Sequence, residues 1–456
     1  MEQNLNNIRK SLAGMRSGKN TGKRVLDEEE AIEIVRTHLG ERLKELSEQG
    51  IGNEKKEKDK PFFRKQFDRY KNLVSDIVFK EDLRIRGYEQ NEIHRFIHKC
   101  THEIKGYSVL AEAFEDPGVS DIYCIKWDTI FVERNGENAR YEHIFKNEKH
   151  YNETLFRFLQ EAGKEINNGD KKIVDFELYG DRGCATSPRV SPSGYSLTLR
   201  KHSEDHIKRD DLINYKVVSE EIADLLGLVV VGESNLIYAG ITGSGKTTTI
   251  RAILDYYVTR ANKRMLLCED TQELFPENEH TLQLVSVKSS DPEQAVPLDQ
   301  LIITALRLKP KYIVVGEVRG LEAQAAVEGM ETGHSTIFTM HGGNPWNIVN
   351  RLVTKYLMAM PALGIDVVER IIGSSLDYIC IQDNIPGVGR KMTMMHEVSY
   401  NFSTRRMELK MICHYDFALK DFVMDNKISM EKANTMMRRG VQWEDVEKWV
   451  EKVAAA

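Results

Sequence analysis

The segment from Gly240 to Thr247 reads Gly-Ile-Thr-Gly-Ser-Gly-Lys-Thr and matches the pattern G-x-x-x-x-G-K-[ST]. The apolar run 236–239 before it predicts a short buried strand, and residues 248–257 after it predict a helix. In this context backbone N–H groups and the positive end of the helix dipole converge on phosphate. Lys246 would reach the β- and γ-phosphates, and the Thr247 hydroxyl would ligate Mg²⁺. The pattern therefore predicts a nucleoside triphosphate site formed by Gly240, Ile241, Thr242, Gly243, Ser244, Gly245, Lys246, Thr247 and Thr248.

Length and composition restrict the classes of protein to which the chain can belong. Its 456 residues exceed what one core usually serves, so two or three domains are expected. The net charge of −6 carries no basic signature, so direct nucleic acid binding is not expected. Six scattered cysteines with no C-x-x-C pair favour reduced thiols over disulfides or a zinc ribbon. Because the sequence has neither a spanning apolar run nor a secretory signal, we expect a cytoplasmic protein that reaches a membrane only through partners.

The pattern of apolar, polar and charged residues along the chain predicts an α/β protein with five parts. Residues 1–104 are expected to be a helical, partly flexible extension, with a basic leader at 1–24 and a charged linker at 50–60. Residues 105–201 mix helices with alternating strands, and Asn135-Gly136 is a hairpin-turn dipeptide, so an α+β domain is predicted. A polar linker at 202–214 then precedes a domain at 215–400 in which apolar strands alternate with helices, as in a parallel sheet. A helical extension is predicted at 401–456.

Three further clusters follow the phosphate loop, at the ends of predicted strands, where open parallel sheets bind their ligands. Glu269 and Asp270 come after the strand 265–268 and could order the Mg²⁺ shell or water, although acidic turns after strands are commonplace. Glu317 follows the strand 312–315 and could polarise an attacking water. Gly316 stands where many P-loop ATPases carry a metal-binding aspartate, so magnesium would depend more on Thr247, Glu269 and Asp270.

Two histidines flank the next predicted strand. His334 precedes it and His341 ends it, and either could sense the γ-phosphate. A structural role is the alternative, since lone histidines are more often structural. Metal ligation by this pair is disfavoured because no cysteine or third histidine accompanies it.

The order of these motifs resembles that of the type II and type IV secretion ATPases. The matching segments are the phosphate loop, the acidic run at 269–274, Val-Gly-Glu-Val-Arg-Gly at 315–320 and the histidine segment 332–341. Segments 110–122, 130–136 and 196–201 resemble that family's N-terminal domain, and 390–398 resembles its closing strand. The closest likeness is to the CpaF-like branch of conjugation and Tad pili. The resemblance implies a RecA-like ATPase domain that uses ATP and Mg²⁺ in a hexamer.

The same resemblance implies roles for individual residues. Glu317 is the expected catalytic glutamate, Glu269 and Asp270 assist the metal and water, and His334 and His341 match the family's histidine motif. Arg200 matches a position expected to approach the γ-phosphate from the N-terminal domain, with Arg189 as a second candidate. The implied protein is a motor that hydrolyses ATP to ADP and phosphate at the cytoplasmic face of the cell membrane. Its implied partners are inner-membrane components of a secretion or pilus machine.

Two other functions are compatible with a phosphate loop. A motor acting directly on DNA would present a basic, aromatic-bearing pore surface, for which Arg405-Arg406 and Arg438-Arg439 are too sparse. An assembly scaffold that binds ATP with little turnover is the second alternative. The intact Lys246, Thr247 and Glu317 favour hydrolysis over that scaffold.

Overall fold

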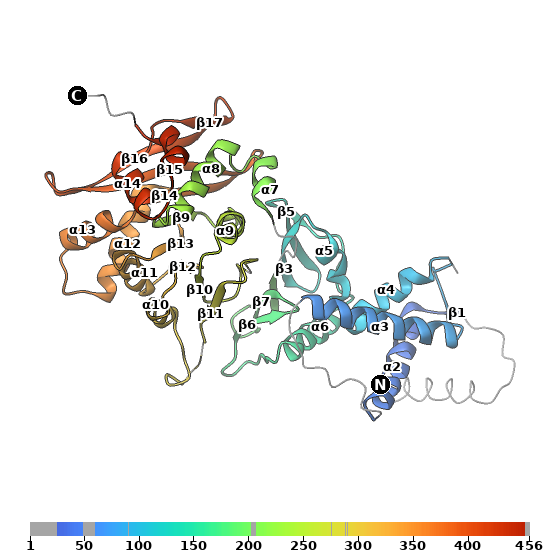
Figure 1. Ribbon diagram of the computed structural model, residues 1–456. Coiled ribbons are helices and arrows are strands. Elements are labelled where there is room, and N and C mark those ends of the chain that lie inside the picture. Colours follow the sequence, from blue (N-terminus) through green and yellow to red (C-terminus); the bar gives the residue numbers. More distant parts are fainter. Residues whose placement is uncertain are drawn as a thin grey trace. The chain divides into compact units, whose positions relative to one another are not determined.

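The computed structural model describes residues 25–48, 60–89, 91–201, 207–274, 276–287, 289 and 291–451. The predicted leader at 1–24, the charged linker up to residue 59 and the terminal alanines lie outside the described residues. The chain divides into two compact units, Met1–Glu204 and Asp205–Ala456 (Figure 1). The unit boundary falls within the predicted linker at 202–214.

The first unit begins with a helical subdomain that has its own apolar core. Val35, Val74 and Phe96 are buried at its centre, one from each of its three long helices. A short parallel pairing of two strands completes the subdomain. The helical extension predicted from the apolar periodicity is therefore present over the described residues. Its elements are β1 (Val25–Leu26), α2 (Glu28–Glu48), α3 (Lys60–Lys80), β2 (Arg84–Ile85) and α4 (Ile93–Ile104).

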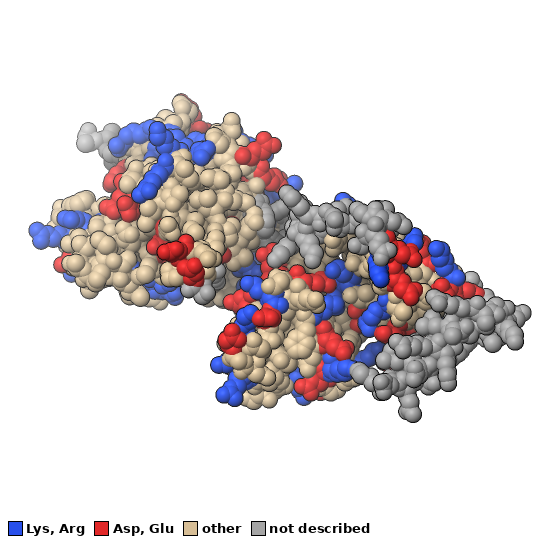
Figure 2. Space-filling view, turned by 90° about the horizontal axis from the view of Figure 1, so that it is seen from below, with Lys and Arg blue, Asp and Glu red and all other residues tan. Residues whose placement is uncertain are grey.

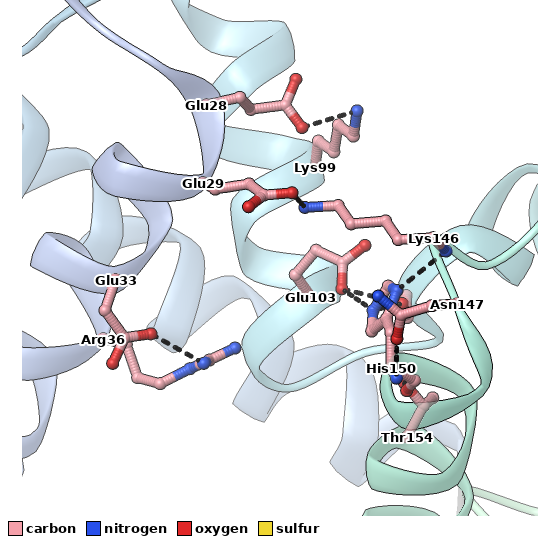
Figure 3. Close-up of polar contacts among 11 residues, drawn as sticks. Glu28, Glu29, Glu33, Arg36, Lys99, Glu103, Lys146, Asn147, His150 and Thr154 are labelled. Carbon is pink, nitrogen blue, oxygen red and sulfur yellow. Dashed lines mark hydrogen bonds and ion pairs between the residues drawn. The ribbon is translucent and has the colours of Figure 1, made fainter. Parts of the chain in front are cut away.

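Polar contacts join this subdomain to the rest of the first unit (Figure 3). Lys146 Nζ donates to Glu29 Oε1 at 2.7 Å, which links α2 to the start of α6 (Glu148–Glu161). Nε2 of His150, in the first turn of α6, lies 3.0 Å from Glu103 Oε2 of α4. On the face drawn in Figure 2, acidic and basic side chains lie interspersed.

The remainder of the first unit is an antiparallel sheet in the order β5-β4-β3-β8-β7-β6. Asn135 and Gly136 join β4 to β5 with positive φ angles of 53° and 85°, as a type I′ hairpin turn requires. This confirms the predicted hairpin turn. The bounds are η1 (Ser108–Leu110), α5 (Ala111–Glu115), β3 (Val119–Lys126), β4 (Thr129–Arg134), β5 (Glu137–Arg140), β6 (Ile173–Leu178), β7 (Asp181–Thr186) and β8 (Ser196–Arg200).

The second unit is built on a nine-stranded sheet in the order β11-β10-β12-β13-β9-β14-β15-β16-β17. The first six strands in this order are parallel, and β15 to β17 are antiparallel. The strands are β9 (Leu236–Gly240), β10 (Met265–Glu269), β11 (Thr281–Val285), β12 (Tyr312–Val315), β13 (Ser335–His341), β14 (Tyr378–Ile385), β15 (Gly389–Asn401), β16 (Arg406–Asp416) and β17 (Asp421–Met424).

Helices cover both faces of this sheet, and β9 shows the reason. Leu236 and Tyr238 point into one apolar cluster, shared with α8, α9 and α14, while Ile237 and Ala239 point into a second, shared with α10 to α13. A parallel strand buried on both faces reads as a continuous apolar run. The predicted α/β class is confirmed. The helices are α7 (Arg209–Asn214), α8 (Glu220–Val231), α9 (Lys246–Arg260), α10 (Leu298–Arg307), α11 (Glu322–Glu331), α12 (Pro345–Ala359), α13 (Ile365–Ser375), α14 (Met430–Arg438) and α15 (Trp443–Val446).

Two predicted segments need correction. Residues 401–424 do not belong to a helical extension, because β15, β16 and β17 continue the sheet, and only α14 and α15 beyond them are helical. The predicted linker also contains α7, whose Leu212 is buried in the core of the second unit. In both cases tertiary packing decided the structure of segments whose local pattern is weak.

Candidate functional site

The phosphate loop leaves the sheet at the carboxyl end of β9 and enters α9. Gly243 and Gly245 have φ angles of +76° and +88°, conformations in which glycine avoids strain. The Lys246 ammonium donates to the loop's own carbonyls, at 3.0 Å from Gly240 O and 2.9 Å from Ile241 O. Ser244 Oγ is buried and has no hydrogen-bond partner among the described residues. A loop with glycine turns, a lysine and an unpaired buried hydroxyl fits a phosphate ligand.

The side chain of Gln382 in β14 supports this loop through hydrogen bonds. No motif in the sequence predicted this residue. Its side chain is 1% exposed, and its Oε1 accepts hydrogen bonds from Tyr238 Oη at 2.6 Å and Thr249 Oγ1 at 2.9 Å. Its Nε2 donates to the carbonyl of Ser244. One amide thus joins β9, the loop and α9. Nothing local in the sequence signals this role, because residue 382 lies more than 130 positions after the loop.

Glu317 follows β12 and faces the same edge of the sheet. Its Oε2 accepts a hydrogen bond from Arg319 at 2.6 Å, and its Oε1 lies 2.8 Å from His341 Nε2. Oε1 is buried and has no aligned hydrogen-bond donor within the described chain. Burial raises the pKa of Glu317, but the hydrogen bond from Arg319 and the positive charges of Arg319 and Lys246 outweigh it, so the pKa is lowered. The carboxylate is therefore ionised at neutral pH.

His341 ends β13 level with the start of the phosphate loop, because His341 pairs with Gly240 in the parallel register of β13 and β9. Burial, followed by the positive charge of Lys246, lowers the pKa of His341. The ring is therefore neutral at neutral pH. His341, Lys246 and Glu317 form one electrostatic cluster at the carboxyl edge of the sheet.

The two adjacent carboxylates at the end of β10, Glu269 and Asp270, have different roles. Glu269 is 1% exposed, and its Oε1 accepts the backbone N–H groups of Glu273 and Leu274 at 3.0 and 3.1 Å, which shapes the turn. Asp270 is exposed and accepts from Ser286 Oγ at 3.0 Å. A Cβ built on Gly316 would lie 3.1 Å from Glu269 Cγ. The Glu269 side chain thus lies where a side chain at position 316 would need room.

Most of the predicted site residues of the second unit are brought together, and His334 is not. The phosphate loop, Glu269, Glu317 and His341 lie at the carboxyl ends of β9, β10, β12 and β13. His334 precedes β13, so it lies at the amino-terminal ends of the strands, seven residues before His341 and roughly 23 Å from it at about 3.3 Å per residue. Its Nδ1 lies 3.1 Å from Thr332 Oγ1. Arg189 and Arg200 belong to the first unit, and their approach to the loop stays a prediction.

The strand order defines the class of protein. In the sheet, β13 lies between β9, which leads into the phosphate loop, and β12, which Glu317 follows. This arrangement, with helices on both faces, is the predicted RecA-like P-loop fold. Residues 181–450 match the family described as "Type II/IV secretion system protein". The chain belongs to that family.

Several relatives and solved structures are similar to this chain. Protein MJ0900 of Methanocaldococcus jannaschii is 32% identical over 264 residues, which are 57% of this chain and 47% of that protein. The conjugal transfer protein TrbB of Rhizobium radiobacter is 31% identical over 202 residues, 44% of this chain and 59% of TrbB. The pilus retraction motor PilT with bound ADP aligns with 73% of this chain and 85% of its own, at 19% identity and a TM-score of 0.45.

The chain spans about half the length of the MJ0900 relative. Among the described helices, none combines the length and the apolar character needed to cross a membrane.

Proposed function

We propose that this chain hydrolyses ATP to ADP and phosphate and is the motor subunit of a secretion, conjugation or pilus machine. The observation that carries the proposal is that the phosphate loop, Glu317 and His341 converge at the carboxyl ends of the parallel strands. Phosphoryl transfer to water needs phosphate positioning, charge stabilisation and an oriented nucleophile. The cluster offers a group for each of these needs.

Each residue has a task in this proposal. The Lys246 ammonium turns from the carbonyls of Gly240 and Ile241 to the β- and γ-phosphates, while the loop N–H groups bind phosphate oxygens. The buried Oε1 of Glu317 accepts a hydrogen bond from the attacking water and orients it. Thr247 would hold Mg²⁺, and the ion would supply positive charge to the phosphates. Asp270 would orient the water around that ion, and Glu269 acts mainly by shaping the turn after β10.

The finer parts of the proposal rest on the family resemblance. They are a hexameric ring, a CpaF-like conjugation or Tad-type branch, action at the cytoplasmic face of the membrane, and inner-membrane partners. The names of the relatives TrbB and "Putative conjugal transfer protein" from Mycobacterium tuberculosis support the conjugation branch. Arg200 or Arg189 would supply positive charge to the γ-phosphate from the first unit. His334 would have no contact with the phosphate loop of its own chain.

The test is steady-state ATP turnover of the wild type beside Glu317→Gln, at matched oligomeric state and with Mg²⁺. We expect the variant to fall at least ~10²-fold, which corresponds to ~2.7 kcal/mol of barrier. Glu331→Gln is the matched control, because Glu331 ends α11 at the amino-terminal ends of the strands. Equal turnover in wild type and Glu317→Gln would refute the assignment of Glu317. A wild type that binds ATP without Mg²⁺-dependent turnover would favour the scaffold.

A further inference from the structure

Two histidines and a glutamate converge in the first unit, far in sequence from the phosphate loop. His98 and His102 are four residues apart on α4, so they lie on one face of the helix. Their rings stack with centroids 4.7 Å apart. Glu115 Oε1, at the end of α5, lies 2.9 Å from His98 Nε2 and 3.2 Å from His102 Nε2. Both imidazoles thus direct the same ring nitrogen at one carboxylate oxygen.

These distances are those of hydrogen-bonded pairs, and they also fit a ligand set around a small cation. The three ligand atoms lie within 4.8 Å of one another. Four ligands at the 2.0–2.1 Å bond lengths of zinc are separated from each other by about 3.3 Å in a tetrahedron. The two nitrogen–oxygen separations differ from this value by only a few tenths of an ångström. Small rotations of the three side chains would place a cation between them.

The surroundings differ on the two sides of the cluster. The His102 side chain is 6% exposed, and the Phe67 ring lies 4.4 Å from the His102 ring and 6.1 Å from the His98 ring. The Glu115 side chain is 52% exposed, so one side of the cluster is open to water. One side of the cluster is therefore apolar and closed to solvent, and the other side leaves room for water as a fourth ligand.

We propose that His98 Nε2, His102 Nε2 and the Glu115 carboxylate bind one divalent transition cation of the Zn²⁺ type, with water as the fourth ligand. Two imidazoles select such a cation over Mg²⁺ or Ca²⁺, which prefer oxygen ligands. The cation joins α4 to α5 and so ties the helical subdomain to the start of the antiparallel sheet.

Binding at this site has a local cost that the structure identifies. The backbone N–H of Tyr107 donates to His102 Nδ1 at 3.3 Å, so the ring proton is on Nε2, facing Glu115. A cation at Nε2 requires the other neutral tautomer, in which that proton has moved to Nδ1, and an Nδ1–H group can no longer accept the hydrogen bond from Tyr107. Because metal-bound imidazoles usually donate their second N–H to an acceptor, we expect weaker affinity than in a site with that second bond.

The experiment uses the full chain, stripped with a chelator, free of nucleotide and then titrated with ZnCl₂. We expect about one more Zn²⁺ bound per chain in the wild type than in His98→Ala or Glu115→Gln, and a Zn²⁺-dependent rise in Tm that both variants lack. His98 and Glu115 are chosen because each side chain is over a third exposed, which limits damage to the fold.

His143→Ala is the matched control. His143 forms an exposed pair with Glu112 at 2.8 Å, close in geometry to one arm of the site but without a second imidazole. His94→Ala removes an exposed histidine one turn earlier on the same helix. Both controls should keep the wild-type stoichiometry and Tm rise. The proposal is overturned if the wild type and His98→Ala bind equal Zn²⁺, or if either control loses as much as His98→Ala.

Discussion

Replacing Gln382 with methionine isolates the contribution of the amide beneath the phosphate loop. Methionine keeps the length of the side chain but can neither accept from Tyr238 and Thr249 nor donate to Ser244 O. Each buried partner left unsatisfied costs about 1–3 kcal/mol. The two hydroxyls can partly re-pair with each other, so we expect a total near 3 kcal/mol. For a unit of about 250 residues this lowers Tm by roughly 6–12 °C.

The same substitution should weaken nucleotide binding about 10-fold, because the Ser244 carbonyl is no longer tied to β14 and the loop loses its preorganisation. The assays are thermal unfolding without nucleotide and fluorescence titration with a labelled ADP. Gln283→Met is the matched control, since Gln283 lies on the edge strand β11 and its side-chain oxygen accepts from Gln272, a half-buried contact away from the phosphate loop. Its Tm and affinity should stay at the wild-type values.

A double-mutant cycle with Tyr238→Phe sharpens the test. If the two side chains act through their hydrogen bond, the double variant should lose at least ~0.5 kcal/mol less than the sum of the single variants. Strictly additive losses, or an unchanged Tm in Gln382→Met, would refute the reasoning.

Two further predictions concern packing and pH. Gly227→Ala in α8 would place a Cβ 2.1 Å from the Tyr257 ring and should destabilise the second unit by about 1–3 kcal/mol. Gly40→Ala in α2 would place a Cβ that meets nothing within 4 Å and should stabilise the first unit by up to ~1 kcal/mol. Urea unfolding of each variant measures both changes in the free energy of unfolding. Burial raises the pKa of Asp255 from 3.8 to about 6, against the opposing hydrogen bond from the Glu277 N–H. The folded state therefore binds more protons than the unfolded state between pH 4 and 6, so stability falls as pH rises through this window. A shift of about two pKa units equals about 3 kcal/mol, and solvent screening of the partly exposed carboxyl reduces this to about 1–2. Asp255→Asn should gain that amount at pH 7–8 and nothing below pH 4, and a gain independent of pH would contradict this assignment.

Local pattern was sufficient for the elements around the phosphate loop. The apolar runs at 236–239 and 312–315 predicted strands, and the structure has β9 and β12 there. Glycines, a lysine and a strand–helix context specify a phosphate loop through backbone geometry alone, so no distant residue is needed to recognise it. The turn at Asn135-Gly136 was equally local, because these residues adopt positive φ more readily than others.

Long-range packing decided the rest. β16 and β17 were missed because they belong to the sheet only through pairing with β15, which no residue in 401–424 reveals. The sequence placed His334 and His341 in one motif, but the direction of β13 puts them at opposite ends of the strand.

The sequence did not reveal Gln382 or the trio His98, His102 and Glu115, and the reason is the same for both. Each acts on groups that are distant along the chain or on another element, and only the folded structure brings them within hydrogen-bond distance. The sequence by itself determined what the phosphate loop can bind. The tertiary structure decided which side chains support it, because strand order and helix packing set distances that spacing along the chain does not contain.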